Sequence, residues 1–311
     1  MVDTRPMIMF ERFLVDTGIF WQYPARTEEA MYKKQSRENS YMPIPWATII
    51  DKHTDIVRIT NSITQVVMRC HPRPNQTCCQ HVHWRKLLHT FKSLGISKLY
   101  TPHKLRGEDW IDGIQIVACP LFAVNIEDPK FSVGRHSDNG ARRLYLYSFI
   151  GAYAPHYISR IRPLLFEMKH PKDAVVRNIG IWHLEKVVYS QNQNAHGHIT
   201  EDREREARTL EYNAVLCSSN FSLCPSGAGP SSIRLWESLA TGAIPVILSD
   251  GMCLPDESNP IWNKSVVRID EKDIHTLEKT LRKYSDEDIL EMRHACKEAY
   301  AKYALRFEYI R

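Results

Sequence analysis

The stretch that decides the fold is NFSLCPSGAGPSSIRLWESLATGAIPVILSD, which runs from Asn220 to Asp250. It contains two short apolar runs, at 221–224 and 244–248, which are typical of buried strands. Between them lie a turn rich in proline and glycine at 225–230 and a helical repeat of apolar residues at 235–240. This order of strand, loop, helix and strand predicts one βαβ unit of a parallel sheet, with its loop at the carboxyl edge.

The predicted helix carries residues that suggest a ligand. Ser231 or Ser232 can cap its start, and Gly242 fits its end. Because the first amides of a helix have no partners within it and the helix dipole adds positive charge there, this N-terminus predicts an anion site. Arg234 adds a charge suited to a diphosphate, and Glu237, one turn on, can accept hydrogen bonds from ribose hydroxyls. The alternative is that Arg234 and Glu237 only pair with each other on a solvated helix.

A longer pattern around this stretch resembles a known family. The stretch, the pair Leu254-Pro255 and Trp262 are together similar to the signature of the exostosin-like glycosyltransferases, a family of the GT47 type. Upstream, RRLYLYSFIG at 142–151 resembles the basic segment and apolar strand that open the donor domain of that family. Compact members of this kind, without a membrane anchor, are known from bacteria and large DNA viruses.

The rest of the chain predicts a second α/β region, and so two domains. Strands are expected at 7–15, 46–50, 77–82, 98–101 and 114–124, a helix at 83–94, and a linker at 125–141. We expect an N-terminal, acceptor-side α/β domain at 1–140 and a C-terminal, nucleotide-sugar-binding Rossmann-like domain at 141–285. A final helix at 286–311 can cross back to the N-terminal domain. The resemblance implies the α/β fold called GT-B, in which two Rossmann-like domains face a central cleft.

Composition and charge exclude several classes of protein. Of the 311 residues, 41 are Lys or Arg and 36 are Asp or Glu, and the basic residues are scattered, so no nucleic-acid-binding face is predicted. The first twenty residues contain several charged side chains, so neither a signal peptide nor a membrane span is predicted there. We expect a soluble cytoplasmic protein, or one of the Golgi lumen if the chain is a trimmed form of an anchored relative. The 8 cysteines lack CxxC spacing, so no zinc site is predicted and the thiols are expected to be mainly reduced.

Sugar transfer from a nucleoside diphosphate requires that the protein stabilise the charge that develops on the departing diphosphate. The residues expected to bind the nucleotide sugar are Ser226, Gly227, Gly229, Ser231, Ser232, Arg234, Glu237 and, from a helix further upstream, Arg160. Arg162 is a further candidate beside Arg160, whereas Asn192 and Asn194 are better explained as a surface turn. The one Asp-x-Asp motif, at 286–288, is typical of a helix start after Ser285, so neither a metal nor another cofactor is predicted.

The reaction also requires a base that takes the proton of the acceptor hydroxyl. We expect this base in the N-terminal domain, where loops after predicted strands contain His81, His83, His103 and Asp109. A histidine near its reference pKa of about 6.5 suits proton abstraction. His103 and His83 are therefore the first candidates for the catalytic base, and Asp109 is the third.

The resemblance implies a hexosyl- or pentosyltransferase that moves a sugar from a nucleoside-diphosphate sugar to a hydroxyl of an oligosaccharide or glycoprotein glycan. It further implies a UDP-linked donor, such as UDP-xylose or UDP-glucuronate, and an inverting displacement without a metal. One alternative is a catalytically silent module that binds glycans or stabilises a partner, since the family forms paired complexes. Another is a nucleotide-binding enzyme of a different reaction type on the same βαβ platform. The residues leave the sugar, the acceptor and the oligomeric state open.

Overall fold

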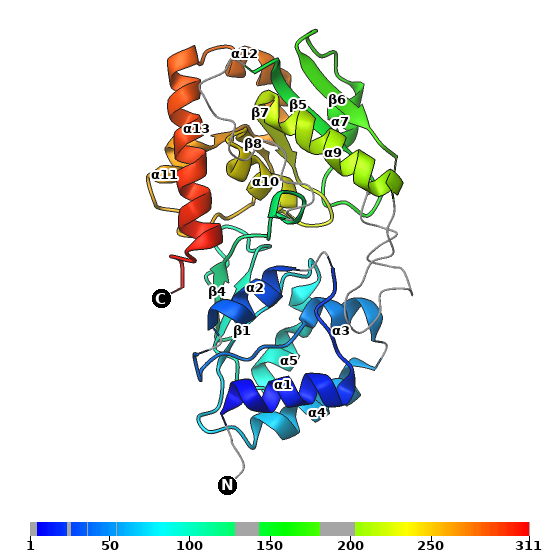
Figure 1. Ribbon diagram of the computed structural model, residues 1–311, viewed down its shortest axis with the longest axis vertical. Helices are drawn as coiled ribbons and strands as arrows, with labels where there is room; N and C mark the ends of the chain where they lie inside the picture. Colours follow the sequence, from blue (N-terminus) through cyan, green and yellow to red (C-terminus); the bar gives the residue numbers. More distant parts are fainter. Residues whose placement is uncertain are drawn as a thin grey trace. The chain divides into compact units, whose positions relative to one another are not determined.

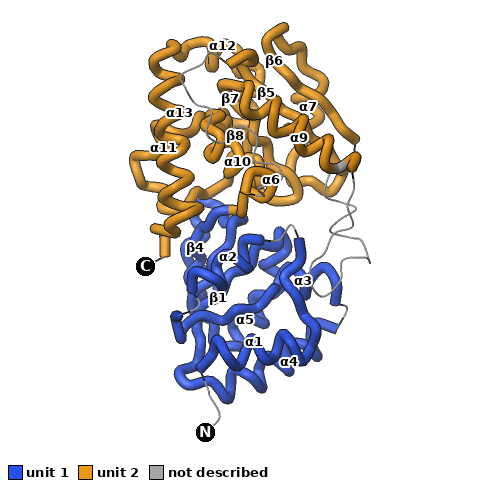
Figure 2. The backbone as a smooth tube through the Cα atoms, in the orientation of Figure 1, with its two compact units in different colours: residues 1–120, 184–200 blue, residues 121–183, 201–311 orange. Residues whose placement is uncertain are grey.

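The computed structural model describes residues 5–23, 26–35, 37–53, 55–127, 143–180 and 203–310 (Figure 1). These residues form two compact units: those up to Pro120 belong to unit 1 and those from Leu121 onward to unit 2 (Figure 2). Each unit has its own sheet of mainly parallel strands flanked by helices, which confirms the α/β class expected for a GT-B protein. The cleft between two facing sheets stays a prediction.

The expected linker at 125–141 and the domain boundary at 140 lie largely outside the described residues. Of that segment, the structure describes the short helix α6 (Val124–Glu127), which packs against helices of unit 2. The chain up to Pro120 belongs to unit 1, and unit 2 begins at Leu121, three residues before this helix. Asn192 and Asn194 also lie outside the described residues.

Unit 1 is built on a four-stranded sheet in the order β1-β2-β4-β3. Its parallel strands are β1 (Gln76–Cys78), β2 (Lys98–Thr101) and β4 (Ile114–Ala118), and β3 (Trp110–Ile111) pairs with β4 in an antiparallel hairpin. β1 and β4 are shorter than the runs expected at 77–82 and 114–124. The amide of Cys79 still donates to the Tyr100 carbonyl of β2 at 2.9 Å, but from Gln80 onward the segment forms hydrogen bonds to a helix instead.

The helices of unit 1 include two segments that we expected to be strands. They are α1 (Pro6–Thr17), α2 (Arg26–Gln35), α3 (Trp46–Lys52), α4 (Ile56–Val67), the 3₁₀ helix η1 (Trp84–Leu87) and α5 (Leu88–Ser93). The strands expected at 7–15 and 46–50 are therefore wrong. In α1 the buried residues Met7, Phe10 and Phe13 recur every three residues, which is a helical period. α3 is buried along its first turn, and a short apolar run does not distinguish a buried helix from a buried strand.

Unit 2 is built on a five-stranded, wholly parallel sheet in the order β6-β5-β7-β8-β9. The strands are β5 (Tyr145–Gly151), β6 (Ala174–Asn178), β7 (Ser219–Pro225), β8 (Ile244–Leu248) and β9 (Val267–Arg268). Counted within the unit, this is the doubly wound order 2-1-3-4-5. The strand order reverses between β5 and β7, and loops at the carboxyl ends of two such strands commonly hold the ligand of a doubly wound sheet.

The βαβ unit expected within 220–250 is confirmed. Helix α10 (Ile233–Thr241) connects β7 to β8, and Gly242 ends the helix with a φ of 67°. The other helices of unit 2 include α7 (Ile161–Glu167), α9 (Arg203–Cys217), α11 (Ile261–Ser265), α12 (Leu277–Leu281) and α13 (Asp286–Tyr300). α13, red in Figure 1, packs against α10, α11 and β8. Whether it also crosses back to unit 1 stays a prediction.

The Asp-x-Asp motif at 286–288 begins helix α13, as expected. The hydroxyl of Ser285 accepts a hydrogen bond from the Asp288 amide at 3.1 Å, and the Asp288 carboxylate accepts one from the Ser285 amide at 2.8 Å. This reciprocal pair is a capping box, and it gives the carboxylate a structural partner.

All 8 cysteines lie in the described part of the chain, and none forms a disulfide. Seven are buried and Cys217 is partly exposed. Burial raises the pKa of Cys70 to about 11 and that of Cys224 to about 12. The expectation of mainly reduced thiols therefore agrees with their placement in the two cores.

Candidate functional site

The candidate donor site lies on the loop at 225–232, which leads from β7 into α10 at the carboxyl edge of the unit 2 sheet. The amide of Ser226 donates to the Leu248 carbonyl at 3.0 Å, which extends the pairing of β7 with β8 by one residue. The amide of Gly227 donates to the Gly229 carbonyl at 3.0 Å, so the loop turns tightly. Because this loop follows β7, it lies at the point where the strand order reverses.

Arg162 holds this loop in place from the first turn of α7. Its guanidinium donates to the carbonyls of Ser226 and Ala152, both at 2.8 Å, and to that of Pro225 at 3.4 Å. It also lies over the Tyr157 ring, 4.8 Å from the ring centroid. A Cβ atom on Gly227 would lie 2.9 Å from this guanidinium, which explains the glycine. Burial lowers the pKa of Arg162 to about 10, so the group remains charged near neutral pH.

Arg160, the arginine that we expected to bind the nucleotide, lies two residues earlier and is exposed. It occupies the N-cap position of α7 without a side-chain cap bond. The spacing of residues in the sequence does not show which of the two arginines contacts the loop, because it does not determine the residue at which the short helix starts. Its part in nucleotide binding stays a prediction.

Arg234 lies in the first turn of α10 and faces aromatic rings. Its guanidinium donates to the Ile150 carbonyl at the end of β5. It lies over the Phe149 and Tyr212 rings, at 4.7 and 5.0 Å from their centroids. The carbonyl takes one donor of a group that has five, so the guanidinium can also contact an anion.

Glu237 is buried inside unit 2, with 1% of its surface exposed. Its carboxylate accepts hydrogen bonds from the side chain and backbone of Asn125, at 2.7 and 3.3 Å, and from the Tyr212 hydroxyl at 2.7 Å. Burial raises the pKa of Glu237, and the Tyr212 hydroxyl, the Arg234 charge and the Asn125 donors oppose that rise. The alternative interpretation, a solvated pair of Arg234 and Glu237, is therefore wrong. A contact of Glu237 with ribose stays a prediction.

Two serine hydroxyls at the start of α10 are buried and lack partners. The Oγ atoms of Ser231 and Ser232 contact no solvent and form no hydrogen bond with any described group. Ser232 is the N-cap residue, with an extended backbone, and its side chain makes no cap bond. Buried hydroxyls without partners are uncommon in native proteins, since each costs about 1–3 kcal/mol. An anion at the helix N-terminus would give both hydroxyls an acceptor.

Ser226 has partners that sequence reasoning missed. Its hydroxyl lies 2.9 Å from the hydroxyl of Ser159 and donates to the Glu271 carboxylate at 3.2 Å. Burial raises the pKa of Glu271, and the Asp250 charge adds to that rise. Glu271 and Asp250 follow neighbouring strands, so the βαβ topology could have indicated them.

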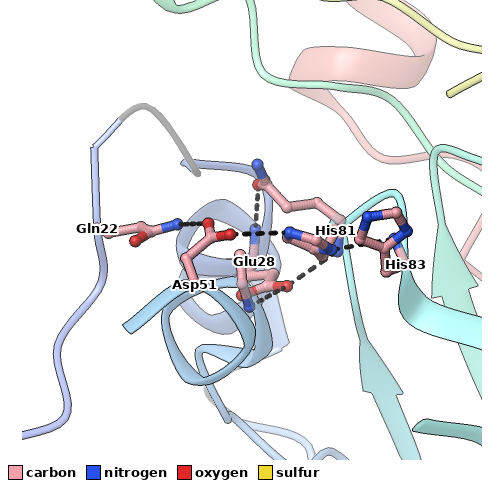
Figure 3. Close-up of polar contacts among 7 residues, drawn as sticks. Gln22, Glu28, Asp51, His81 and His83 are labelled. Carbon is pink, nitrogen blue, oxygen red and sulfur yellow. Dashed lines mark hydrogen bonds and ion pairs between the residues drawn. The ribbon is translucent and has the colours of Figure 1, made fainter. Parts of the chain in front are cut away.

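The candidate base His83 and its neighbour His81 follow β1, at the carboxyl end of the unit 1 sheet (Figure 3). His81 donates from Nε2 to Asp51 at 3.0 Å, and Asp51 also accepts from Gln22 at 2.6 Å. The amide of His83 donates to Nδ1 of His81 at 3.0 Å, and the two imidazole rings lie 5.3 Å apart. The ring of His83 is exposed at this edge. Sequence reasoning missed Asp51, because its contact with His81 joins residues 30 positions apart in the chain.

His103 and Asp109 both follow β2, but His103 is buried and Asp109 is exposed. His103 is 4% exposed, and its Nδ1 atom has no partner among the described residues. Burial lowers the pKa of His103 to about 3, and the nearby His81 and Arg85 add to this effect. Asp109 has 74% of its side chain exposed and accepts from the Lys104 ammonium at 2.6 Å. His103 is thus a neutral, weakly basic imidazole, and Asp109 a solvated carboxylate.

The described residues contain no group of three or more His, Cys, Asp or Glu side chains arranged to hold a metal ion. Among the same ranges, no helix is both long enough and apolar enough to cross a bilayer.

Comparison with protein families gives a match over most of unit 2 and the last part of unit 1. The model of the family described as the exostosin GT47 domain matches residues 79–284 of this chain. The matched range includes the His81 segment, the β7–α10 loop and α10.

Among individual proteins, the Exostosin-1 homolog of Caenorhabditis elegans is 28% identical over 191 residues, which cover 60% of this chain and 48% of that protein. Exostosin-1 of Drosophila melanogaster is 27% identical over 194 residues, which cover 60% of this chain and 24% of that protein. A probable glucuronoxylan glucuronosyltransferase of Arabidopsis thaliana is 32% identical over 100 residues, which cover 32% of this chain and 21% of that protein. The chain thus spans less than half the length of these relatives.

Among solved structures, one titled "S. aureus MnaA-UDP co-structure" aligns with 93% of this chain and 96% of its own. The TM-score is 0.39 and the sequence identity is 10%.

Replacing Arg162 tests whether this residue holds the β7–α10 loop. In Arg162→Met, three carbonyls lose their donor inside unit 2, so we expect the free energy of unfolding to fall by about 3 kcal/mol. The matched control is Arg160→Met, in which an exposed arginine is replaced and the change should stay within about 0.5 kcal/mol. Urea unfolding followed by tryptophan fluorescence measures both. Equal stability of the two variants would contradict the assigned role.

The burial of His103 predicts a loss of stability in acid. Because its folded pKa lies below the unfolded value of about 6.5, the unfolded chain binds a proton here that the folded chain does not. The contribution is complete above pH 6.5 and falls by about 1.4 kcal/mol per pH unit as the pH drops toward 3. His103→Gln, compared with the exposed control His89→Gln, should remove this slope from urea unfolding between pH 6 and 4. An unchanged slope in His103→Gln would show that the imidazole titrates normally.

Proposed function

This chain belongs to the exostosin GT47 family, and we propose that it is a glycosyltransferase that moves a sugar from a nucleoside-diphosphate sugar to a hydroxyl of a glycan. The observation that carries the proposal is the start of α10, where two buried serine hydroxyls without partners adjoin Arg234. Three kinds of group belong to this part of the chain: the serine hydroxyls, the Arg234 guanidinium and the backbone amides of a helix N-terminus. A diphosphate offers acceptor oxygens to all three.

The same groups suit the chemistry of the departing diphosphate. As the bond between the anomeric carbon and the phosphate oxygen breaks, negative charge moves onto the diphosphate. Arg234 and the helix dipole of α10 are fixed before the reaction, so they can stabilise this charge without reorganising. This is the role that a metal ion fills in other enzymes, and we propose that the reaction proceeds without one.

The names of the relatives guide the choice of donor. One relative is a probable glucuronoxylan glucuronosyltransferase, and others are exostosins. We therefore take UDP-linked sugars as donors, with UDP-glucuronate and UDP-xylose as the first to test, and an oligosaccharide or glycoprotein glycan as acceptor.

The acceptor hydroxyl needs a base on the opposite side of the reacting carbon if the displacement inverts its configuration. Of the three predicted bases, His83 has the environment that suits this role best, since its imidazole is exposed while its backbone is bound to His81. His103 is too weak a base, and Asp109 is already paired with Lys104. In the proposed step the acceptor oxygen bonds to the anomeric carbon, its proton passes to His83, and the diphosphate leaves with the electrons of the broken bond.

Serine variants at the start of α10 test the donor site. Ser231→Ala and Ser232→Ala should each weaken UDP binding about tenfold, because each removes a hydrogen bond to a charged group. In the absence of UDP the same variants should be as stable as the parent protein or more stable, since each loses a buried hydroxyl without a partner. Calorimetry and urea unfolding measure the two quantities. The control is the exposed Ser258→Ala, which should change neither. Unaltered UDP affinity in both α10 variants would remove the start of this helix from the site.

Activity is tested by following UDP release from UDP-sugars with and without glycan acceptors. We expect acceptor-dependent release, and a product whose anomeric configuration by NMR is inverted. We also expect the rate to change less than about twofold in EDTA, because Arg234 and α10 supply the positive charge. Loss of activity in EDTA that manganese restores would contradict the proposal of a metal-independent reaction. Tight UDP binding without release in the presence of any acceptor would favour the alternative, a catalytically silent module.

A further inference from the structure

The segment after β1 is held by more contacts than a surface turn needs. Its backbone amide at Gln80 donates to the buried Glu28 carboxylate at 2.9 Å, and the Gln80 side chain accepts from the Thr27 amide of α2 at 2.7 Å. The Glu28 carboxylate also accepts from the Ala47 amide in the first turn of α3, at 3.2 Å. These reciprocal bonds fix the segment against two helices at once.

Beyond these anchors, a series of hydrogen bonds leads to one carboxylate (Figure 3). The amide of His83 donates to Nδ1 of His81, Nε2 of His81 donates to Asp51, and Gln22 donates to the other oxygen of Asp51. Every donor in this series points toward the Asp51 carboxylate. His81 must therefore carry its proton on Nε2, since Nδ1 accepts.

Both ring nitrogens of His81 are thus engaged within unit 1, whereas the ring of His83 reaches the surface beside it. His81 and Asp51 have only 13% and 10% of their side chains exposed. This largely buried carboxylate–imidazole pair holds the backbone of His83 in place, and its negative charge lies close to the exposed imidazole.

We infer that Asp51 and His81 are positioning residues that fix the orientation of His83 and, through the Asp51 charge, favour its protonated form when it takes the acceptor proton. This inference rests on the function proposed above. Neither residue needs to touch the substrate, because His81 acts through the His83 amide and Asp51 acts through His81. The titratable groups that also act on Asp51 or His81 are Glu28 on α2, Lys52 on α3, Cys79 directly after β1 and His103 after β2, and Arg85 in η1 acts on His103.

Two substitutions of His81 separate its two bonds. An asparagine at this position can place its carbonyl oxygen where Nδ1 lies and still accept from His83, but it does not reach Asp51. A glutamine can place its amide where Nε2 lies and still donate to Asp51, but it offers no acceptor at the Nδ1 position. If His81 acts through the His83 amide, His81→Gln should lower kcat about 30-fold, with both KM values within about twofold of the parent values, and His81→Asn should restore a large part of that loss. Equal kcat values in the two variants, at whatever level, would overturn the inference.

Asp51→Asn tests the charge, because an asparagine oxygen still accepts from His81. Without the negative charge, protonated His83 is less stable, so the acidic limb of the kcat–pH profile should move down by about 0.5 pH unit. The control is Asp55→Asn, which removes a nearby charge that caps α4. An acidic limb at the same pH in Asp51→Asn and the parent protein would overturn the inference.

A measurement without substrate separates this inference from the proposed function. In protein labelled with 15N at histidine, NMR should show His81 as the Nε2–H tautomer, and the measured pKa of His83 should fall by about 0.5 in Asp51→Asn. If the parent protein releases no UDP with any acceptor, the proposed function fails while this test still decides whether the chain of contacts acts on His83. A His83 pKa that is the same in both proteins would contradict the electrostatic part of the inference. UDP affinity should stay unchanged in all four variants, since they lie in unit 1.

Discussion

The loop between β7 and α10 depends on one partly buried guanidinium. Arg162 binds three carbonyls that come from the ends of β5 and β7, the two strands between which the strand order reverses. A loop made of proline, glycine and serine has few side chains with which to fix its own shape. The hydrogen bonds from Arg162 fix the shape of the loop, and Gly227 has no side chain that would clash with the guanidinium. The direction in which α10 starts, and with it the position of the serine hydroxyls, follows from this contact.

Two segments of the described structure differ in how their polar groups are bound. At the start of α10, the hydroxyls of Ser231 and Ser232 are buried without partners, which lowers the stability of the ligand-free protein. Around the segment that follows β1, the polar groups of Glu28, Gln80 and Asp51 each have more than one hydrogen-bond partner. In the function proposed above, the first segment gives hydrogen bonds to a ligand that brings its own oxygen atoms, and the second holds the side chain that takes the proton.

The sequence predicted the parts of the fold that local signals specify. The apolar runs, the Pro-Gly turn and Gly242 determined the βαβ unit, and Ser285 with its acidic neighbours determined the start of α13. The runs at 7–15 and 46–50 misled because apolar content alone does not tell a buried helix from a strand. The choice between Arg160 and Arg162 depends on the turn at which α7 starts, and the role of Asp51 depends on a contact with a residue thirty positions away. Contacts between residues so far apart produce no periodic pattern in the sequence.

The placement of the thiols bears on how the protein can be handled. Seven of the 8 cysteines are buried, and burial raises the pKa of several of them, so these sulfur atoms are shielded and poorly nucleophilic while the fold persists. Cys217, at the end of α9, is the partly exposed one. A maleimide dye added to the native protein would accordingly attach at one position, and further labelling would report the opening of a core. The wild-type chain thus carries a built-in attachment point for fluorescence spectroscopy, without any prior removal of cysteines.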